Sequence, residues 1–477
     1  METQPLFVEG AWITGDETFP VFDPGTGECI AQVTKGGAEV AHRAIESAHR
    51  ARRMWRETTG RTRGAILAAA ASILEGRTDE VARTLTRENG KPLGQSIAEV
   101  NGAVDHLQWF SEEARRGYGR IVPNQVADKR HLILKEPVGV VGAIAPWNFP
   151  LMLAARKVAP ALAAGCPVVL KPATATPLTA LLLADCLEAA GVPAGVFHVV
   201  AGDTAGIGAE FMRNPHCRKV SFTGSTAVGK QLIRDSAETV TKLSLELGGH
   251  APVLIFADAD IDVAVAGALT TKFRNNGQSC IAANRIYVEH SIYDVFLERF
   301  TARVAQMKVG YGLDPGVEIG SLIDQAALTT ALDHIEDAKR SGGRIVTGGH
   351  QFAGDTGYFL APTVIDRPGA TSLCMREETF APVAPVVSFT SEEEAIAVAN
   401  DTPYGLAAYA YTSNLNRAFR LMEQIEAGTV GINDAVPSTS NCPFGGMKES
   451  GVGRELGFEG MDAFMEVKHI SLGGMAP

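Results

Sequence analysis

Short apolar runs alternate with longer helical patterns through the middle of the chain. The pattern predicts a strand over 138–147, a helix over 151–165 that ends at a glycine, and a strand in "PVVLKP". A helix over 178–190 and a strand in "GVFHVV" follow. Strands joined by single helices predict a parallel, doubly wound α/β sheet of the Rossmann-like kind, which binds ligands at the carboxyl ends of its strands.

A second series of the same kind follows. "RKVSFTG" predicts a strand, 225–236 a helix and "VTKLSLEL" another strand. After two glycines, "APVLIFADAD" opens a new alternation with a helix over 261–273 and the strand "RIYVEH". We therefore expect a second α/β domain with its own sheet, preceded by mostly helical residues 39–114 and followed by a terminal strand.

Composition limits the class of protein. A chain of 477 residues exceeds what one hydrophobic core supports, and 45% apolar with 20% charged residues is typical of globular proteins. The net charge of -11 argues against a nucleic-acid or anionic-membrane partner. Seven scattered cysteines without CxxC spacing predict a reduced, cytoplasmic protein without a metal site. We also expect neither a signal peptide nor a transmembrane span.

One cysteine lies in an unusual setting. "NNGQSCIAANR" places Cys280 among small and amide residues, whereas Cys166 lies in an apolar run of the kind that suits a cysteine kept for packing. A loop cysteine without a role is the common alternative. A nucleophilic thiol must be reachable and partly ionised, and the setting of Cys280 predicts such a thiol.

Two other polar residues follow predicted strands. Glu246 ends "LSLEL" directly before two glycines, where a carboxylate is a candidate general base or a salt-bridge partner. Asn148 ends the strand in "APWNFP", where its amide could donate to an oxyanion or cap the following helix. A strand, a helix and a loop separate Glu246 from Cys280, and this path can bring the base to the nucleophile.

A candidate dinucleotide site lies along the first series. In "SFTGSTAVGK", Gly224 and Gly229 would let the backbone approach an anion at a helix N-terminus, although GxGxxG is absent and ordinary helices also begin this way. Lys171 follows a strand and could reach a ribose or phosphate, or simply be solvated. An acidic residue three positions later would select NAD, whereas the uncharged Thr174 favours NADP slightly over NAD.

Six stretches together resemble a known family. "PWNFP", "FTGST", "LELGG", "GQSC", "EETFAPV" and "PFGGMKESGVGRE" occur in the order and at about the spacing of the aldehyde dehydrogenase superfamily, and the resemblance covers nearly the whole chain. It implies that Cys280 is the nucleophile, Glu246 the base that activates water, and Asn148 with the Cys280 N–H the oxyanion hole. Lys157 and Glu455 match positions that assist proton movement near the base.

The resemblance also implies the contacts of a nicotinamide dinucleotide. Two letters depart from the common "EEIFGPV", since Thr379 replaces isoleucine and Ala381 replaces glycine, but the carboxylate of Glu378 is kept. The residues expected to contact the cofactor are Ala145, Pro146, Trp147, Lys171, Thr174, Gly224, Ser225, Gly229, Leu247, Glu378 and Phe380.

The substrate is indicated by arginines. On a helix that begins after Pro150, positions 148 and 156 share a face, so Arg156 can point along the same channel as Asn148. Arg285 lies in the cysteine loop, and guanidinium groups bind carboxylates bidentately, although structural salt bridges are the alternative. "AARKVAPAL" and "CIAANR" resemble the succinate semialdehyde dehydrogenase branch, in which equivalent arginines and a serine matching Ser438 bind the substrate carboxylate.

The expected reaction is therefore NAD(P)-dependent oxidation of a short acid-ended aldehyde, such as succinate semialdehyde, through a cysteine thiohemiacetal and thioester. Pro437 departs from the usual pattern before the serine, so the substrate length stays open. Lactaldehyde-, glycolaldehyde-, sulfo- and phosphono-aldehydes also stay open, as does the less favoured alternative of a cysteine hydrolase or thioesterase.

The resemblance implies a division into domains. Residues 1–117, 139–248 and 427–459 would form the NAD(P)-binding domain, and 249–426 the catalytic domain. Residues 118–138 and 460–477 would supply the oligomerisation strands of a homodimer or homotetramer.

Overall fold

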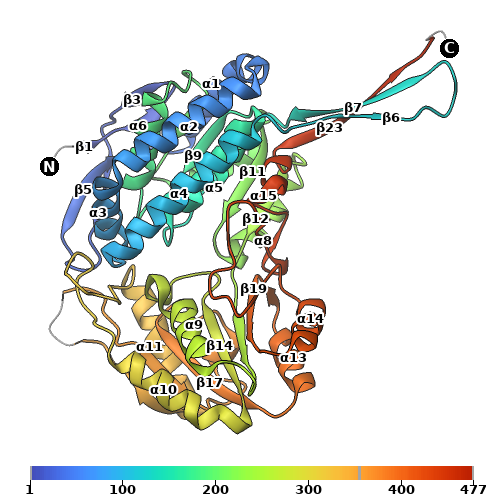
Figure 1. Ribbon diagram of the computed structural model, residues 1–477. Helices are drawn as coiled ribbons and strands as arrows, with labels where there is room; N and C mark the ends of the chain where they lie inside the picture. The colour runs from blue at the N-terminus through green and yellow to red at the C-terminus, as the bar shows by residue number, and fades with distance from the viewer. Residues whose placement is uncertain (1–2, 353–355, 475–477) are drawn as a thin grey trace.

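Two large sheets and a projecting arm make up the molecule. The computed structural model describes residues 3–352 and 356–474. An eight-stranded and a seven-stranded sheet each form the centre of an α/β body, and a three-stranded sheet extends away from both (Figure 1). The predicted fold class is confirmed.

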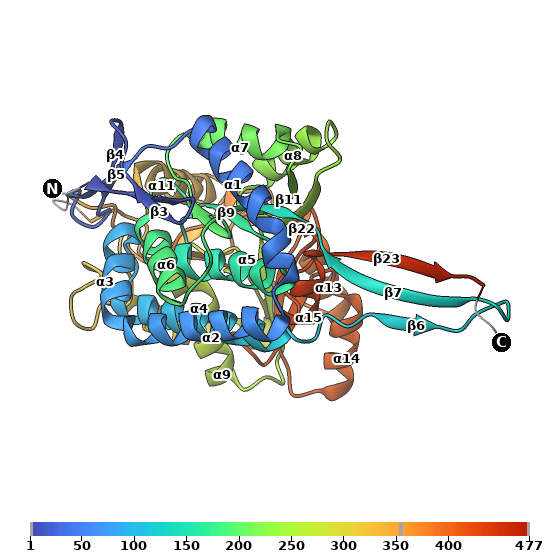
Figure 2. The same cartoon turned by 90° about the horizontal axis from the view of Figure 1, so that it is seen from above.

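The first body contains the predicted doubly wound sheet. Its strand order is β22-β12-β11-β8-β9-β10-β2-β3, and the five strands from β12 to β10 are parallel. Figure 2 shows α1, α7 and α8 on one face of this sheet and α2, α4, α5 and α6 on the other. The strands are β2 (Leu6–Val8), β3 (Ala11–Ile13), β8 (Val140–Ile144), β9 (Val168–Lys171), β10 (Phe197–Val199), β11 (Cys217–Thr223), β12 (Lys242–Glu246) and β22 (Gly451–Val452).

Eight helices cover this body or connect its strands. They are α1 (Ala38–Glu57), α2 (Gly60–Gly76), α3 (Thr78–Asn89), α4 (Leu93–Glu113), α5 (Pro150–Ala164), α6 (Leu178–Ala189), α7 (Thr204–Arg213) and α8 (Thr226–Ser236). A small sheet of order β1-β5-β4 lies beside them, with β1 (Thr3–Gln4), β4 (Thr18–Phe22) and β5 (Cys29–Thr34).

Helix α5 is a buried helix that carries two charged residues. It begins at Pro150, which suits the first helical position because its missing N–H would have no partner there, and ends before Gly165 at φ 96°. Every residue of α5 except Met152 is buried between the sheet and α4. Arg156 and Lys157 are therefore buried charges on an otherwise apolar helix, which indicates a role other than solubility.

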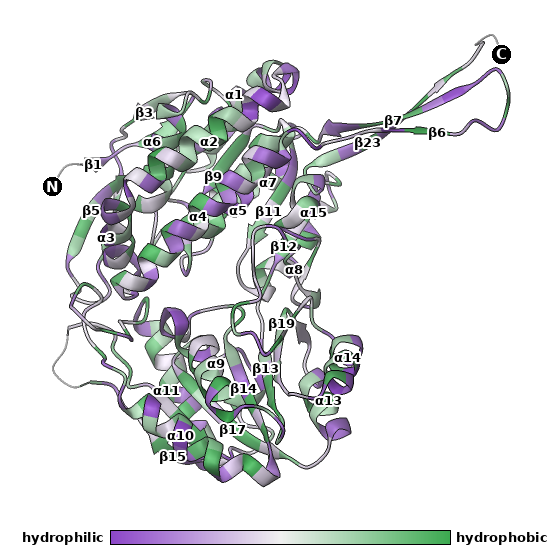
Figure 3. Cartoon of the chain, in the orientation of Figure 1, coloured by the Kyte–Doolittle hydropathy of each residue, from purple (hydrophilic) through white to green (hydrophobic). Residues whose placement is uncertain are grey.

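The second body is built on a sheet of order β15-β16-β17-β14-β13-β19-β20. Figure 3 shows its central strands mostly in the hydrophobic colour, as expected for parallel strands covered on both faces. The strands are β13 (Ala251–Ile255), β14 (Ala283–Glu289), β15 (Arg344–Thr347), β16 (Thr363–Asp366), β17 (Val383–Phe389), β19 (Ala407–Tyr411) and β20 (Thr429–Ile432).

Helices α9 (Ile261–Phe273), α10 (Tyr293–Ala305), α11 (Gln325–Arg340), α12 (Leu373–Arg376), α13 (Glu392–Asn400) and α14 (Leu415–Gln424) belong to this body. The short helices η1 (Arg274–Gly277) and η2 (His290–Ile292) flank β14, and β18 (Tyr404–Gly405) pairs with β21 (Met447–Lys448).

One expected domain boundary is wrong. We expected residues 427–459 to return to the first body, but β20 pairs in parallel with β19 and forms the edge of the seven-stranded sheet. The chain rejoins the first sheet only at β22, which pairs with β12. The reason is that α14 forms a helical crossover between β19 and β20, which is the connection that joins two parallel strands of one sheet.

The arm is an antiparallel sheet of order β23-β7-β6, with β6 (Arg120–Val122), β7 (Arg130–Pro137) and β23 (Met465–Leu472). Helix α15 (Gly457–Asp462) connects it to the first body. Both views show the arm reaching well beyond the two bodies. Ile121 and Val467 on it are 77% and 67% exposed, which is unusual for large apolar side chains. In the described ranges, no helix is long and apolar enough to cross a membrane.

Candidate active site

A cavity of about 220 Å³ lies where the carboxyl ends of the first sheet meet the second body. The segments that follow β8, β11 and β12 form one wall, and the cysteine loop and the segment before β17 form the other. Nine residues that the sequence singled out line it, together with Thr223 and Gly248: Pro146, Trp147, Asn148, Gly224, Ser225, Leu247, Cys280, Glu378 and Phe380.

The cysteine loop leaves α9 through a left-handed turn. Asn275, Asn276 and Gly277 have φ values of 53°, 57° and 75°, a region that asparagine and glycine tolerate better than other residues. A Cβ on Gly277 would lie 2.2 Å from the carbonyl oxygen of Ala381, so glycine is required at that position. The turn directs Cys280 towards the first body.

The amides around Cys280 fasten its loop to the second body. Asn276 accepts from the Gly320 N–H at 2.7 Å and donates to the Ser321 carbonyl at 2.8 Å. Gln278 accepts from the Ile323 N–H at 3.0 Å. These bonds account for the amide-rich setting of the cysteine, since each amide replaces a main-chain partner that an irregular loop lacks.

The amide of Asn148 lies against this loop. Its Nδ2 donates to the Gln278 carbonyl at 3.1 Å. Asn275 Nδ2 bridges the two segments, because it lies 2.8 Å from both the Asn148 and the Gln278 carbonyl oxygens. When the Cys280 sulfur adds to a carbonyl carbon, the carbonyl oxygen becomes an oxyanion. The second N–H of the Asn148 amide and the main-chain N–H of Cys280 could donate hydrogen bonds to it.

The thiol is less ionised than expected. Burial raises the pKa of Cys280 to about 12, and the nearby charges of Glu246 and Glu378 also raise it. The prediction of a partly ionised thiol is therefore wrong for the cofactor-free protein, because carboxylates and a low-dielectric surrounding both disfavour a thiolate. The thiolate must therefore form once the site is loaded, and an oxidised nicotinamide, when bound, supplies a positive charge that favours the thiolate and accepts a hydride.

Glu246 is the candidate base for activating water. It ends β12 with 4% exposure, and its Oε2 has no hydrogen-bond partner among the described residues. Burial, followed by the charge of Glu455, holds the pKa of Glu246 well above its ordinary value. Lys157 Nζ and Glu455 Oε1 form a buried ion pair at 2.5 Å, and both charges act on Glu246. The structure thus brings the predicted base and its two assisting residues together.

Lys171 and Thr174 lie beyond the cavity, at the carboxyl end of β9. Lys171 Nζ donates to the Pro172 carbonyl at 3.2 Å, and burial lowers the pKa of Lys171 to about 8. Thr174 Oγ1 donates to the Gly202 carbonyl at 3.3 Å. Ala145 is buried and pairs with Lys171 in the sheet, so it does not line the cavity. These positions fit an extended dinucleotide whose other end occupies the cavity.

The N-terminus of α8 opens directly on the cavity. Gly224 and Ser225 line the cavity, and Ser225 caps the helix with its side chain. Gly229 has a different role, because a Cβ there would lie 2.5 Å from the Leu247 side chain. It lets α8 pack closely against the segment after β12, and in doing so aims the helix N–H groups at the site.

The segment before β17 closes the cavity. Glu378 accepts from the Gly249 N–H at 3.1 Å, and burial raises the pKa of Glu378 to about 7. Phe380 has a φ of 47°, and its ring meets that of Trp147 edge to face at 5.5 Å between centroids. A flat nicotinamide and its ribose would meet aromatic and carboxylate groups of the kind that the resemblance implied.

Arg285 does not reach the site. Its guanidinium donates to the main-chain oxygens of His250, Val398 and Ala399 at 3.1, 2.8 and 2.9 Å, and the residue is 1% exposed. The predicted substrate contact of Arg285 is therefore wrong. It lies on β14 and turns into the second body, away from Cys280.

Arg156 and an arginine that the sequence analysis missed do lie by the thiol. Arg156 is 5% exposed and stacks on the Phe444 ring at 4.8 Å. Arg274 begins the cysteine loop and stacks on Phe149 at 5.2 Å. The charge of Cys280 acts on Arg274, and that of Arg156 acts on Cys280. A charged residue at the end of the apolar helix in "KFRNNGQSC" was the available signal.

These two guanidiniums have no ion-pair partner in the described structure. Among the described residues neither Arg156 nor Arg274 forms an ion pair or a side-chain hydrogen bond, and Arg156 Nε is buried without a partner. Burial and the charge of the other arginine both lower the pKa of Arg274. Neither arginine lines the 220 Å³ cavity, but each lies close enough to Cys280 for its charge and that of the thiolate to interact.

Ser438 is partly buried in the loop between β20 and β21. This loop is tied to α4 by a 2.5 Å hydrogen bond from Ser440 Oγ to Asp105. The structure therefore places Ser438 on an anchored loop, but it shows no polar contact of its side chain in the part of the chain that is described.

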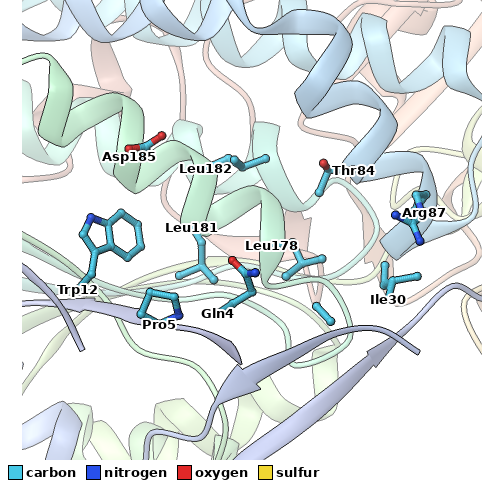
Figure 4. Close-up of a pocket in the computed structure, with 11 residues that line it drawn as sticks. Gln4, Pro5, Trp12, Ile30, Thr84, Arg87, Leu178, Leu181, Leu182 and Asp185 are labelled. Atoms are coloured by element: carbon cyan, nitrogen blue, oxygen red, sulfur yellow. The ribbon is translucent and has the colours of Figure 1, made fainter. Parts of the chain in front are cut away.

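A second hollow lies outside this site. It has a volume of about 360 Å³ and is enclosed by the N-terminal strands, α3 and α6 (Figure 4). Leucines of α6 and the Trp12 ring line much of it, with Arg87 at one end. None of the predicted site residues lines it, so the chemistry belongs to the cavity at Cys280.

Comparisons with known proteins agree with this site. The aldehyde dehydrogenase family model matches residues 12–470. The chain is 46% identical to a glutarate-semialdehyde dehydrogenase of Pseudomonas aeruginosa, covering 99% of this chain and 98% of the relative. It is 45% identical to an Escherichia coli succinate-semialdehyde dehydrogenase whose name specifies NADP(+), covering 98% of each. The crystal structure of a Burkholderia pseudomallei succinate-semialdehyde dehydrogenase matches at 46% identity with a TM-score of 0.97, covering 98% of each chain.

The chain therefore belongs to the aldehyde dehydrogenase family. It is an NAD(P)-dependent enzyme that oxidises an aldehyde to a carboxylic acid, as expected from the sequence.

The raised pKa of Cys280 gives a test of the site. In the cofactor-free enzyme, alkylation of Cys280 by iodoacetamide should accelerate about tenfold per pH unit from about pH 7 to about pH 9, because only the small thiolate fraction reacts. Where Glu246 is ionised, its charge raises the pKa of Cys280, so Glu246→Gln should speed alkylation, most of all at the upper end of this pH range. Peptide mass spectrometry measures the rates, with exposed Cys442 as internal comparison. A plateau below about pH 8 would show that the thiol is already ionised.

Proposed function

We propose that the substrate is a short aldehyde with an anionic far end, such as succinate semialdehyde, and that the cofactor is NADP. The carrying observation is the pair of uncompensated guanidiniums, Arg156 and Arg274, beside Cys280. The names of the similar proteins, which specify succinate and glutarate semialdehydes, support the same class of substrate.

The residues divide the reaction between them. The Cys280 thiolate, which the positive charge of a bound nicotinamide would favour, attacks the aldehyde carbon after the thiol proton passes to water. The Asn148 amide and the Cys280 N–H hold the oxyanion until a hydride leaves and a thioester remains on the sulfur. Glu246 then activates the water that releases the acid. Because Glu246 is buried, the adjoining pair of Lys157 and Glu455 is placed to pass its proton onward.

The far end of the substrate would meet the two arginines. Arg156 lies on α5, just after Asn148, and Arg274 lies at the start of the loop that contains Cys280. An aldehyde that reaches from the oxyanion donors to these guanidiniums must therefore be short. Ser438 is a candidate third contact to the carboxylate. Pro437 leaves the length open, so glutarate semialdehyde and sulfo- or phosphono-aldehydes are the nearest alternatives, ahead of neutral lactaldehyde- or glycolaldehyde-like substrates.

The preference for NADP rests on the end of β9. Lys171 is cationic and Thr174 is neutral, so neither repels a 2′-phosphate on the adenosine ribose. An acidic residue at position 174 would accept the ribose hydroxyls of NAD and repel that phosphate.

We further propose that the arm makes the contacts of a homodimer or homotetramer and that the enzyme is cytoplasmic. The exposed apolar residues of β6 and β23, including Ile121 and Val467, support an interface. The seven cysteines lie within the described residues and form no disulfide, which fits a reducing compartment.

Removing either guanidinium tests the substrate proposal. Arg274→Ala and Arg156→Ala should each raise the KM for succinate semialdehyde at least about tenfold, since a charge-assisted contact contributes about 1.5–3 kcal/mol. The KM for butanal, which has the same carbon count but no charge, should change less than about threefold. Steady-state kinetics with both aldehydes measures this. An equal rise for both aldehydes would show that the arginines support the fold rather than the carboxylate.

Substitution at position 174 tests the cofactor proposal. Thr174→Glu should lower kcat/KM for NADP by at least about tenfold, because a carboxylate would face the 2′-phosphate, while the value for NAD stays equal or rises. Thr174→Ser, which keeps the hydroxyl, serves as control and should change neither ratio. Equal losses with both dinucleotides would place the adenosine ribose elsewhere.

A further inference from the structure

We propose that the buried ion pair of Lys91 and Glu99 is a positioning device that holds the oxyanion donor Asn148 and the substrate arginine Arg274 in register. It rests on the proposed function, because it takes the oxyanion role of Asn148 from there. Neither member of the pair touches the cavity, so both are positioning residues.

Lys91 connects the helical layer of the first body to the reacting centre. It follows the left-handed Gly90 that ends α3, and its ammonium is fully buried. The Nζ donates to Glu99 Oε2 at 2.6 Å and to the main-chain oxygen of Asn148 at 2.6 Å. The second bond fixes the peptide that carries the oxyanion amide, and it converges on the same oxygen as the bond from Asn275.

Glu99 fixes the start of the helix that follows. Its Oε1 accepts from the Leu151 and Met152 N–H groups at 3.0 and 3.2 Å, which are first-turn amides of α5. The N-cap residue Phe149 provides no side-chain cap of its own. The one carboxylate of Glu99 therefore pairs with Lys91 and also fixes the position at which α5 begins. It thereby fixes the position of Asn148, which lies just before the helix.

The ammonium also reaches the substrate arginine through one ring. Lys91 Nζ lies 4.2 Å from the centroid of Phe149, and the guanidinium of Arg274 lies 5.2 Å from the same centroid. The ring thus contacts both cations, which attract its π-system. A shift of Lys91 would move the ring on which Arg274 stacks.

A buried glutamate can cap a helix without an ammonium partner, as Glu88 does at the start of α6. Glu88 is also fully buried and accepts from the N–H groups of Leu178 and Thr179 at 2.7 and 3.1 Å, which start α6. It has no ammonium partner and no contact with the site in the described structure. Burying an ammonium opposes folding unless it is paired, so the added feature at Lys91 is its bond to Asn148.

A double-mutant cycle tests the inference. Lys91→Met keeps the stem but removes the ammonium, and should slow the single-turnover reduction of NADP by succinate semialdehyde at least about tenfold, because small misplacements of reacting groups are costly. With saturating aldehyde, which removes any effect of Arg274 on binding, the same change in an Asn148→Ala background should cost less than about twofold, because no amide remains to be positioned. Lys91→Arg should restore part of the rate.

The controls separate positioning from stability. Glu88→Gln, which weakens a matched buried cap, should lower Tm but leave the single-turnover rate of the folded enzyme unchanged. If Lys91→Met does not fold, the same cycle is run with the pair Lys91→Met and Glu99→Gln, which leaves no unpaired buried charge. Equal losses in both backgrounds, or no loss in the native background, would overturn the inference. If Asn148→Ala alone leaves the rate unchanged, the proposed oxyanion role fails instead.

Discussion

The active site depends on one junction between two separately folded sheets. Asn275 spans it, because a single side-chain amide lies 2.8 Å from main-chain oxygens of both the Asn148 segment and the cysteine loop. Asn148, the proposed oxyanion donor, belongs to the first body, and Cys280, the proposed nucleophile, belongs to the second. Their relative position is therefore set by a few buried hydrogen bonds, each of which is geometrically demanding.

Acidic groups and arginines lie on different sides of this junction and do not pair with one another. On one side, burial raises the pKa of Cys280, Glu246 and Glu378 and so favours their neutral forms, and nearby carboxylates add to this effect for Cys280 and Glu246. On the other side, the guanidiniums of Arg156 and Arg274 form no ion pair with a carboxylate in the described structure. A cofactor with a cationic ring and a substrate with an anionic end would together supply the missing opposite charges, so binding and activation of the thiol are linked.

Much of this arrangement could be predicted from the sequence, because local patterns determine it. The alternation of apolar runs and helical stretches located the strands from β8 to β14 closely, and the ends of β8, β11 and β12 located Asn148, Gly224 and Glu246. Matching motifs to a family then assigned roles that strand ends alone leave open between catalysis, capping and salt bridges.

The failures concern information that no short segment contains. Arg285 is near Cys280 in the chain, but the direction of its side chain depends on which body β14 joins, and the sequence does not show that. Arg274 was missed because its importance comes from Arg156 and the absence of a carboxylate, which are tertiary facts. The pKa of Cys280 depends on burial, and the assignment of β20 depends on pairing with β19. Each requires the assembled fold.

The most direct measurement is intact-mass spectrometry of Glu246→Gln after mixing with NADP and succinate semialdehyde. The account predicts one acyl group per chain, located on the Cys280 peptide and persisting because no base activates water, and no such group on Cys280→Ala. Steady release of acid by Glu246→Gln at the native rate, with an unmodified Cys280, would contradict it.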